Sequence, residues 1–177
     1  TSDTANIILY EPYFQTIPVQ SGWSAVSSYV EPANASIDYL LSPIINDLII
    51  FFNEDGVFYP GADVQTFNTW ATGSGYILKT ENPGNLIFQG LIKYPGEEIL
   101  LSPGWGILPV ISTCPQNATS FIASNPGVSI IKEIDGLKMC WPEQGVFTLE
   151  NMNPGKAYQV FNVTDIEITV AFPGCDN

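Results

Sequence analysis

The sequence predicts a mainly β protein: a single compact β-domain with pseudo-twofold character, built as a barrel or a sandwich over residues 1–177. Three observations indicate this fold class. Short apolar segments end at Gly, Pro or Asp-Gly, which is typical of strands joined by tight turns. A pattern of residues recurs at a constant spacing. Hydrophobic residues make up 45% of the chain and charged residues 13%, which is sufficient for a packed core.

An internal repeat divides the chain into two copies. Residues 17–25 recur 82 positions later, where both copies contain Gly-Trp, and residues 59–76 recur at the same offset. Together these segments keep 8 of 27 residues. We therefore expect two repeats of about 82 residues, over 9–90 and 91–172. The segment 91–96 between them is too short and too apolar for a linker, so we expect the repeats to share one core.

The first half of each repeat is predicted to contain a strand and one short helix. In the first repeat the strand covers residues 23–30. The helix follows, because Ser36 is a suitable N-cap and Tyr39, Leu40 and Ile44 recur at helical spacing.

The second half of the first repeat is predicted to contain a hairpin and a final pair of strands. The hairpin joins residues 48–53 to 57–59 across an Asp-Gly turn. The final pair joins residues 75–80 to 86–90. An additional strand, residues 6–10, precedes the repeat and is expected to cover the edge of a last strand.

The second repeat has the same predicted elements in the same order. Its helix begins at Asn117 or Thr119. Its predicted strands cover residues 105–113, 128–134, 137–141, 156–161 and 166–172. Among these, the second and third form the hairpin, and the last two form the final pair.

The charge balance excludes several classes of function. The chain has 18 Asp and Glu residues, 5 Lys and Arg residues and a net charge of −13, which repels nucleic-acid phosphates and anionic membrane surfaces. The chain has no His, which removes His-dependent catalytic triads and His-based zinc sites. No apolar run is long enough for membrane insertion.

The cysteines and the composition bear on the cellular compartment. Cys114, Cys140 and Cys175 are compatible with one disulfide and one free thiol, or with three buried thiols. A Cys114–Cys140 pairing is slightly favoured over pairings to the tail. Few lysines, many Asn, Thr, Ser, Gly and Pro residues and abundant aromatics are typical of an extracellular β-rich domain. We therefore expect a secreted or cell-surface protein.

Four aromatic residues at equivalent positions of the repeats are expected in the core. Trp23 and Trp105 each follow a Gly at the start of a strand, and a residue that both halves keep usually serves packing. The same argument applies to Tyr76 and Tyr158, whose buried hydroxyl groups would each need a hydrogen-bond partner.

Trp141 is the best candidate for an exposed ligand-binding aromatic. It lies in the longer hairpin of the second copy, and the neighbouring Glu143 and Gln144 could supply hydrogen bonds to sugar hydroxyls. Trp70 is the second ligand-binding candidate, although its alignment with Met152 favours the core.

The sequence offers no catalytic residues, so we expect no enzymatic activity. A glycosidase needs two carboxylates that flank a cleft, but the carboxylates here are scattered over predicted loops. They include Asp38, Asp47, Asp55, Asp63, Glu97 and Glu98. Asp55 and Asp135 are explained by Asp-Gly turns. A hydrolase is the third alternative and would require an acid pair facing across a groove.

Calcium is the ion that the composition leaves open, because it takes carboxylate and carbonyl oxygens and needs no His. The turn at residues 53–56, Asn-Glu-Asp-Gly, has suitable ligand types but lacks EF-hand spacing. Most such acidic turns are only solvated. The metal ligands therefore stay unassigned, and no other cofactor is expected.

The order of these motifs resembles a tandem repeat found in secreted bacterial multidomain proteins. That order is a Gly-Trp strand, a short helix, a hydrophobic strand, an Asp-Gly turn, Tyr-Pro or Trp-Pro, and Gly-x-Gly-Tyr. The sequence departs from the repeat at Ser24 and Gly106, where Asn is common, and at Ile77 and Gln159, where a second aromatic is common. Such repeats are non-catalytic appendages of surface or polysaccharide-degrading proteins, so the resemblance implies an accessory role beside other domains of a larger chain.

We therefore expect a non-catalytic, secreted accessory module that binds carbohydrate and targets a larger protein to a polysaccharide or glycan. The alternative is a structural or adhesive spacer that makes protein contacts. A solvent-facing Trp or Tyr beside Asn, Gln, Asp or Glu would favour the first interpretation, and a chain whose aromatics are all buried would favour the second.

Overall fold

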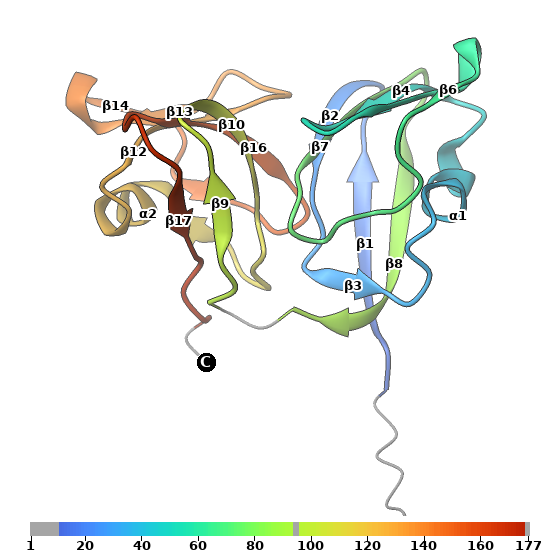
Figure 1. The fold of residues 1–177 in the computed structure, drawn as a ribbon, viewed down its shortest axis with the longest axis horizontal. Coiled ribbons are helices and arrows are strands. Elements are labelled where there is room, and N and C mark those ends of the chain that lie inside the picture. Colours follow the sequence, from blue (N-terminus) through green and yellow to red (C-terminus); the bar gives the residue numbers. More distant parts are fainter. Residues whose placement is uncertain (1–10, 94–95, 176–177) are drawn as a thin grey trace, which may run out of the picture.

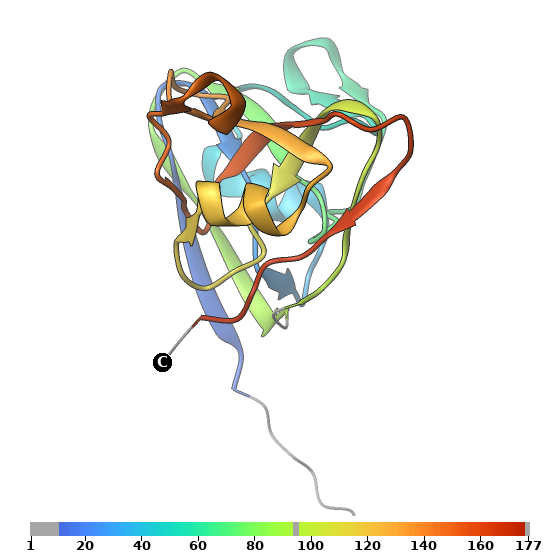
Figure 2. The same cartoon turned by 90° about the vertical axis from the view of Figure 1, so that its left-hand side faces the viewer.

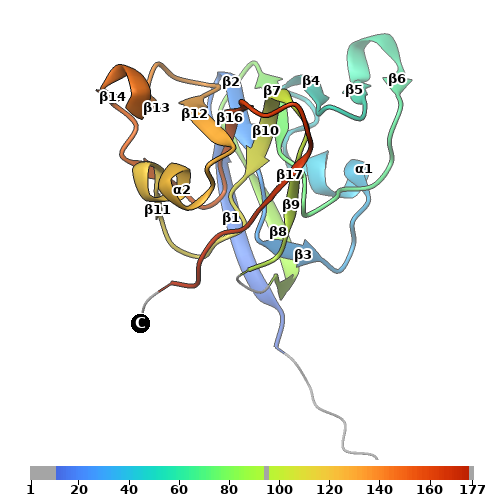
Figure 3. The same cartoon turned by 60° about the vertical axis from the view of Figure 1, so that its left-hand side comes forward.

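The computed structural model describes residues 11–93 and 96–175, and the fold is mainly β, with two short α-helices and several antiparallel sheets (Figure 1). This confirms the predicted fold class, and the arrangement is consistent with a β-sandwich. Two five-stranded sheets lie at the same end of the molecule and meet near its centre (Figure 1, Figure 3).

The N-terminal half contains one five-stranded and one three-stranded sheet. Its strands are β1 (Tyr13–Val19), β2 (Gly22–Val26), β3 (Val30–Pro32), β4 (Leu48–Phe52), β5 (Val57–Tyr59), β6 (Val64–Gln65), β7 (Tyr76–Thr80) and β8 (Gly84–Ile92). The sheet orders are β2-β7-β4-β5-β6 and β1-β8-β3. Alternate residues of β1, β7 and β8 are buried, so these strands each present one face to the core.

The C-terminal half repeats the connectivity of the larger sheet. Its strands are β9 (Ile99–Leu101), β10 (Gly104–Pro109), β11 (Gln116–Asn117), β12 (Val128–Glu133), β13 (Met139–Trp141), β14 (Val146–Phe147), β15 (Asn151–Met152), β16 (Ala157–Asn162) and β17 (Ile168–Val170). The five-stranded sheet has the order β10-β16-β12-β13-β14, which matches β2-β7-β4-β5-β6 strand for strand. The remaining strands pair as β9 with β17 and β11 with β15.

Each half contains one short α-helix, as predicted: α1 (Ile37–Leu41) and α2 (Ala118–Ser124). Figure 2 faces the C-terminal half and shows α2 toward the viewer. The side chain of Asn117 caps α2 by accepting a hydrogen bond from the Ser120 N–H at 2.9 Å. Three 3₁₀ turns complete the regular structure: η1 (Ser42–Ile44), η2 (Pro60–Ala62) and η3 (Pro142–Gln144).

The predicted final strand pair of each repeat is wrong. The strand β7 pairs with β2 and β4, whereas β8 pairs with β1 and β3. Likewise, β16 pairs with β10 and β12, and β17 pairs with β9. The chain changes sheet between Thr80 and Gly84, where Pro83 has no N–H to donate to a ladder. The predicted strand at residues 6–10 lies outside the described residues.

The core consists of two hydrophobic clusters, one in each half, so the expectation of one shared core is wrong. The N-terminal cluster joins Ile17 and Leu86 of the small sheet to Phe51 and Leu78 of the large sheet. Within the described residues, Tyr29 is the one side chain that packs against both clusters. Each half therefore buries most of its apolar side chains by itself.

Hydrogen bonds rather than apolar contacts join the halves at Ser27, which is fully buried. The Ser27 hydroxyl donates to the Lys156 carbonyl at 2.6 Å and accepts from the Val110 N–H at 2.9 Å. The Ser27 N–H donates to the Gly155 carbonyl at 3.1 Å. At Ser27 the junction between the halves is therefore polar.

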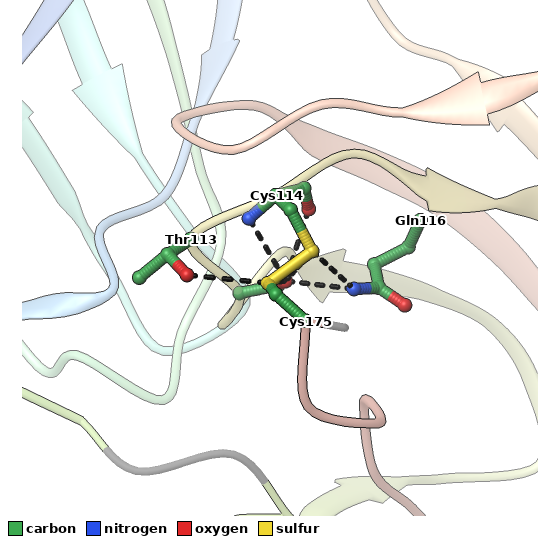
Figure 4. The surroundings of a disulfide bond; sticks show 5 residues. Thr113, Cys114, Gln116 and Cys175 are labelled. Carbon is green, nitrogen blue, oxygen red and sulfur yellow. Dashed lines mark hydrogen bonds between the residues drawn. A yellow bond between two sulfur atoms is a disulfide. The ribbon is translucent and has the colours of Figure 1, made fainter. Parts of the chain in front are cut away.

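The disulfide joins Cys114 to Cys175, and Cys140 is free and buried, so the predicted Cys114–Cys140 pairing is wrong (Figure 4). The physical reason is the alternation along β13, which directs Cys140 into the C-terminal core cluster. The Gln116 amide donates to the Cys114 sulfur at 3.3 Å. The bond ties the segment before α2 to the segment after β17.

Candidate functional site

The predicted Trp141 cluster lies in a single turn. Trp141 ends β13 and is half-buried, and the 3₁₀ turn η3 that follows presents Glu143 and Gln144 to solvent. The three side chains are thus brought together, as the sequence indicates, and their role in ligand binding stays a prediction.

Trp70 is not available to a ligand from solution. It is 4% exposed, and its ring centroid lies 4.1 Å from that of Tyr76 and 4.7 Å from that of Phe88. The ring therefore packs between Tyr76 of the large sheet and Phe88 of the small sheet of the N-terminal half. Trp70 is therefore a core residue, as its alignment with Met152 indicates, and its prediction as a ligand-binding residue is wrong.

Trp23 and Trp105 are exposed, which corrects the expectation that they belong to the core. Their exposed fractions are 47% and 48%. Successive side chains of a strand point to opposite faces, and in β2 the inward positions are taken by the buried Ser24 and Val26. Trp23 therefore lies on the outer face of its sheet, and Trp105 occupies the corresponding position at the start of β10.

Trp23 lies between a lysine and a phenylalanine. Lys79 is directly opposite it on β7, with its Nζ atom 5.4 Å from the indole centroid. Phe52 on β4 approaches edge-on at 6.2 Å between ring centroids. We call Trp23, Lys79 and Phe52 the Trp23 platform.

Trp105 has the same two kinds of neighbour in exchanged positions. Phe161 is directly opposite it on β16, at 5.1 Å between ring centroids. Lys132 on β12 places its Nζ atom 5.0 Å from the indole centroid. We call Trp105, Lys132 and Phe161 the Trp105 platform.

The strand registers establish the exchange. Lys79 and Phe161 both lie opposite the tryptophan of their half. Phe52 and Lys132 both lie on the next strand of the sheet, paired with Ile77 and Gln159 at equivalent positions of the two halves. Each tryptophan therefore has one cation and one aromatic ring beside it, although the residue types at the two positions are swapped. Sequence analysis did not find this exchange, because it appears only once the register is known.

The platform lysines are free of carboxylate partners. Over residues 11–93 and 96–175, the ion pairs are Lys93–Glu97 and Lys156–Asp135, so neither Lys79 nor Lys132 is paired. The chain carries 18 acidic residues and only 5 basic ones. Two of the five cations thus lie at the two exposed indoles rather than beside acidic side chains.

A separate groove lies beside α1. Its volume is 260 Å³, and its lining includes Asn34, Tyr39, Ile87 and Gln89. Tyr39 is 58% exposed. At the equivalent third position of α2 stands Ser120.

Tyr76 and Tyr158 are buried, as predicted, and their hydroxyl groups are satisfied. Tyr76 accepts a hydrogen bond from the Ala71 N–H at 2.8 Å, and Tyr158 accepts one from the Asn153 N–H at 2.9 Å. Burial is the largest cause that raises the pKa of both phenols above the ordinary value of 10.0. These side chains support the sheets from inside.

The acidic turn at residues 53–56 uses its polar atoms within the fold. The Asn53 side-chain oxygen accepts from the N–H groups of Asp55 and Gly56, each at 3.0 Å. The Glu54 carboxylate accepts from the Ile107 N–H of β10 at 2.9 Å, across the junction of the halves. Among the described residues, no group of three or more His, Cys, Asp or Glu side chains could hold a metal ion.

No helix in the part of the chain that the structure describes is long and apolar enough to cross a membrane. Comparison with protein-family models, with curated proteins and with solved structures finds no match to this chain. The resemblance to a secreted bacterial repeat therefore stays a prediction from the motifs.

Proposed function

We propose that the protein is a non-catalytic, secreted or cell-surface module that binds a polysaccharide or glycan through the Trp23 and Trp105 platforms. The supporting observation is that both halves keep an exposed tryptophan at the same place, on the outer face of a sheet. An indole that lay there only for packing would gain more from the core. A flat apolar ring with a polar neighbour is the surface on which a sugar ring stacks.

Two further observations support the accessory role. The Cys114–Cys175 disulfide suits an oxidising, extracellular compartment. The motif order resembles repeats that accompany other domains in larger secreted proteins. In this proposal the module has no catalytic residues and holds its parent protein against a glycan.

The test is a titration of the whole chain with soluble plant, algal and microbial polysaccharides, followed by calorimetry and by tryptophan fluorescence. Trp23→Ala and Trp105→Ala should each weaken binding about tenfold, and the double variant should not bind. Tyr59→Ala removes an exposed aromatic on the same sheet and is the matched control, which should bind like the wild type. Trp141→Ala tests whether the η3 turn, which is the site predicted from the sequence, binds the ligand.

Unchanged affinity in the double variant would overturn the proposal, as would a failure of every polysaccharide to bind. Loss of affinity in Trp141→Ala alone would move the site to the η3 turn.

A structural or adhesive spacer is the second candidate function, and a different surface favours it. On the outer face of the β1-β8-β3 sheet, Phe14, Ile87 and Leu91 are 59%, 50% and 57% exposed. Clustered apolar side chains of this kind are typical of protein contacts. Sedimentation of the wild type and of Phe14→Ser would test self-association. A monomer at all concentrations would count against contacts between copies.

A further inference from the structure

We infer that both platforms recognise an acidic glycan, with the face of a sugar against the indole and the sugar carboxylate paired with Lys79 or Lys132. This inference rests on the carbohydrate-binding function proposed above and names the class of ligand.

The ammonium groups already occupy part of the surface that a sugar would use. Each Nζ atom lies over an indole, at 5.4 Å for Lys79 and 5.0 Å for Lys132. A neutral sugar that stacks on the ring has to displace the ammonium without replacing its interaction. A sugar with a carboxylate attracts the ammonium away from the ring and forms a charge-assisted hydrogen bond with it. The platforms therefore favour an acidic sugar over a neutral one of the same shape.

The exchange between the halves shows that each indole keeps a cation even where the residue types differ. The position opposite the tryptophan is Lys79 in one half and Phe161 in the other. The position on the adjoining strand is Phe52 in one half and Lys132 in the other. A packing role for these positions needs no cation in either half, since phenylalanine occupies each position once. A role in binding an anion needs one cation in each platform, which is what the two halves have.

The distribution of charge also favours the binding of a carboxylate at the two platforms. A net charge of −13 repels anions over long distances. At physiological salt that field is screened within about 8 Å, so the nearest charge decides the energy of a bound carboxylate. Each indole has an ammonium group within 5.4 Å of its centroid, and neither ammonium group has an acidic partner in the described residues. Binding should therefore depend on local contacts rather than on general attraction to polyanions.

The experiment compares polygalacturonate, alginate and hyaluronan with the carboxyl-reduced, neutral form of each polymer, in 0.15 M salt and by calorimetry. At least one acidic polymer should bind ten times or more tighter than its reduced form, which corresponds to about 1.4 kcal/mol. The double variant Lys79→Gln with Lys132→Gln should lose this preference. Lys138→Gln, which removes an exposed lysine away from the indoles, is the control for net charge and should keep it.

An exchange variant makes the test specific to the platforms. Phe52→Lys with Lys79→Phe gives the first half the arrangement of the second, and it should retain binding in a Trp105→Ala background. Lys79→Phe alone, in the same background, leaves the indole with two phenylalanine rings and no cation, and it should lose the preference for the acidic polymer. Unfolding curves of both variants confirm that they are folded.

The outcomes separate the inference from the proposed function. Equal binding of acidic and reduced polymers, abolished by Trp23→Ala with Trp105→Ala, would overturn the inference and keep the carbohydrate function. Binding of acidic polymers that survives both lysine substitutions would also overturn the inference. Failure of every polymer, acidic or neutral, would overturn both.

Discussion

The two halves of the molecule hold the segment before their α-helix in place in different ways. In the N-terminal half, the segment before α1 forms the strand β3, which pairs with the end of β8. In the C-terminal half, the segment before α2 is joined to the segment after β17 by the Cys114–Cys175 disulfide. The small sheet is also shorter there, because β9 has 3 residues and β1 has 7. The comparison teaches that a covalent bond can replace a missing ladder of hydrogen bonds.

Removing the disulfide should have the largest effect on stability, because the segment before α2 then loses its covalent link to the segment after β17. Cross-linking residues separated by 61 positions stabilises the folded chain by about 4 kcal/mol through the entropy of the unfolded chain. We expect Cys175→Ser to lower the free energy of unfolding in urea by that amount. Reducing agent should affect the wild type but not the variant. Equal unfolding midpoints of the wild type and the variant would show that the segment before α2 is held in place without the disulfide.

Gly90→Ala disrupts the corresponding contact of the N-terminal half, which is the pairing of β3 with β8. A Cβ atom at Gly90 would overlap the carbonyl oxygen of Glu31 on β3, so the strand pair has to separate. We expect a loss of about 3 kcal/mol in urea unfolding. Gly73→Ala is the matched control, because a Cβ atom there meets nothing within 4 Å. A similar loss in both variants would contradict the role given to the β3–β8 contact.

Tyr76→Phe and Tyr158→Phe should have smaller and equal effects, since the two phenols do the same task in both halves. Each substitution leaves a backbone N–H, of Ala71 or Asn153, without its acceptor, at a cost of about 2 kcal/mol. Chemical denaturation of the two variants tests this. Clearly unequal losses would show that the halves differ here too.

The same phenols predict a dependence of stability on alkaline pH. Well below pH 10 they are protonated in both the folded and the unfolded state, so pH has no effect through them. Burial raises their pKa in the folded state, so at higher pH the unfolded chain releases protons that the folded protein keeps. Stability should therefore fall as pH rises past about 10. A Tyr76→Phe, Tyr158→Phe double variant should show a shallower fall, measured as the urea midpoint at several pH values.

The smallest effect on stability is expected from the platform lysines. An exposed cation–π contact contributes about 0.5–1 kcal/mol, so Lys79→Gln and Lys132→Gln should each lower the unfolding free energy by no more than that. Thermal unfolding with Lys138→Gln as control measures it. A loss of several kcal/mol would mean that the lysines serve the fold rather than a ligand.

Much of the fold could be predicted because local signals and the repeat agree. The Asp55-Gly56 turn, the N-cap at Asn117 and the buried Tyr76 and Tyr158 follow from the sequence. The sheet change between Thr80 and Gly84 could not be predicted, since a strand, a Pro-Gly turn and another strand also describe a hairpin. Partner choice at that point depends on β1 and β2, which are distant in sequence.

The candidate site was mostly missed, and the reason lies in β2. Trp23 and Ala25 lie on one face of β2, and Ser24 and Val26 lie on the other, so the larger apolar pair suggests that Trp23 is inside. The structure buries Ser24 instead, and its hydroxyl accepts from the Gln20 N–H at 3.1 Å. The orientation does not depend on that hydroxyl, because Gly106 stands at the equivalent position of the second half and Trp105 is exposed as well. The two platforms could not be inferred before that orientation was known.

The disulfide also sets how the two halves respond to tension. A pull applied at Cys175 passes through the sulfur atoms into the chain at Cys114, so the three-residue β9–β17 pair is bypassed and carries little of the load. A pull applied at Tyr13 acts on the first of the seven residue pairs between β1 and β8, without a covalent bypass among the described residues. The load path at Cys175 is therefore mechanically stiffer than the load path at Tyr13.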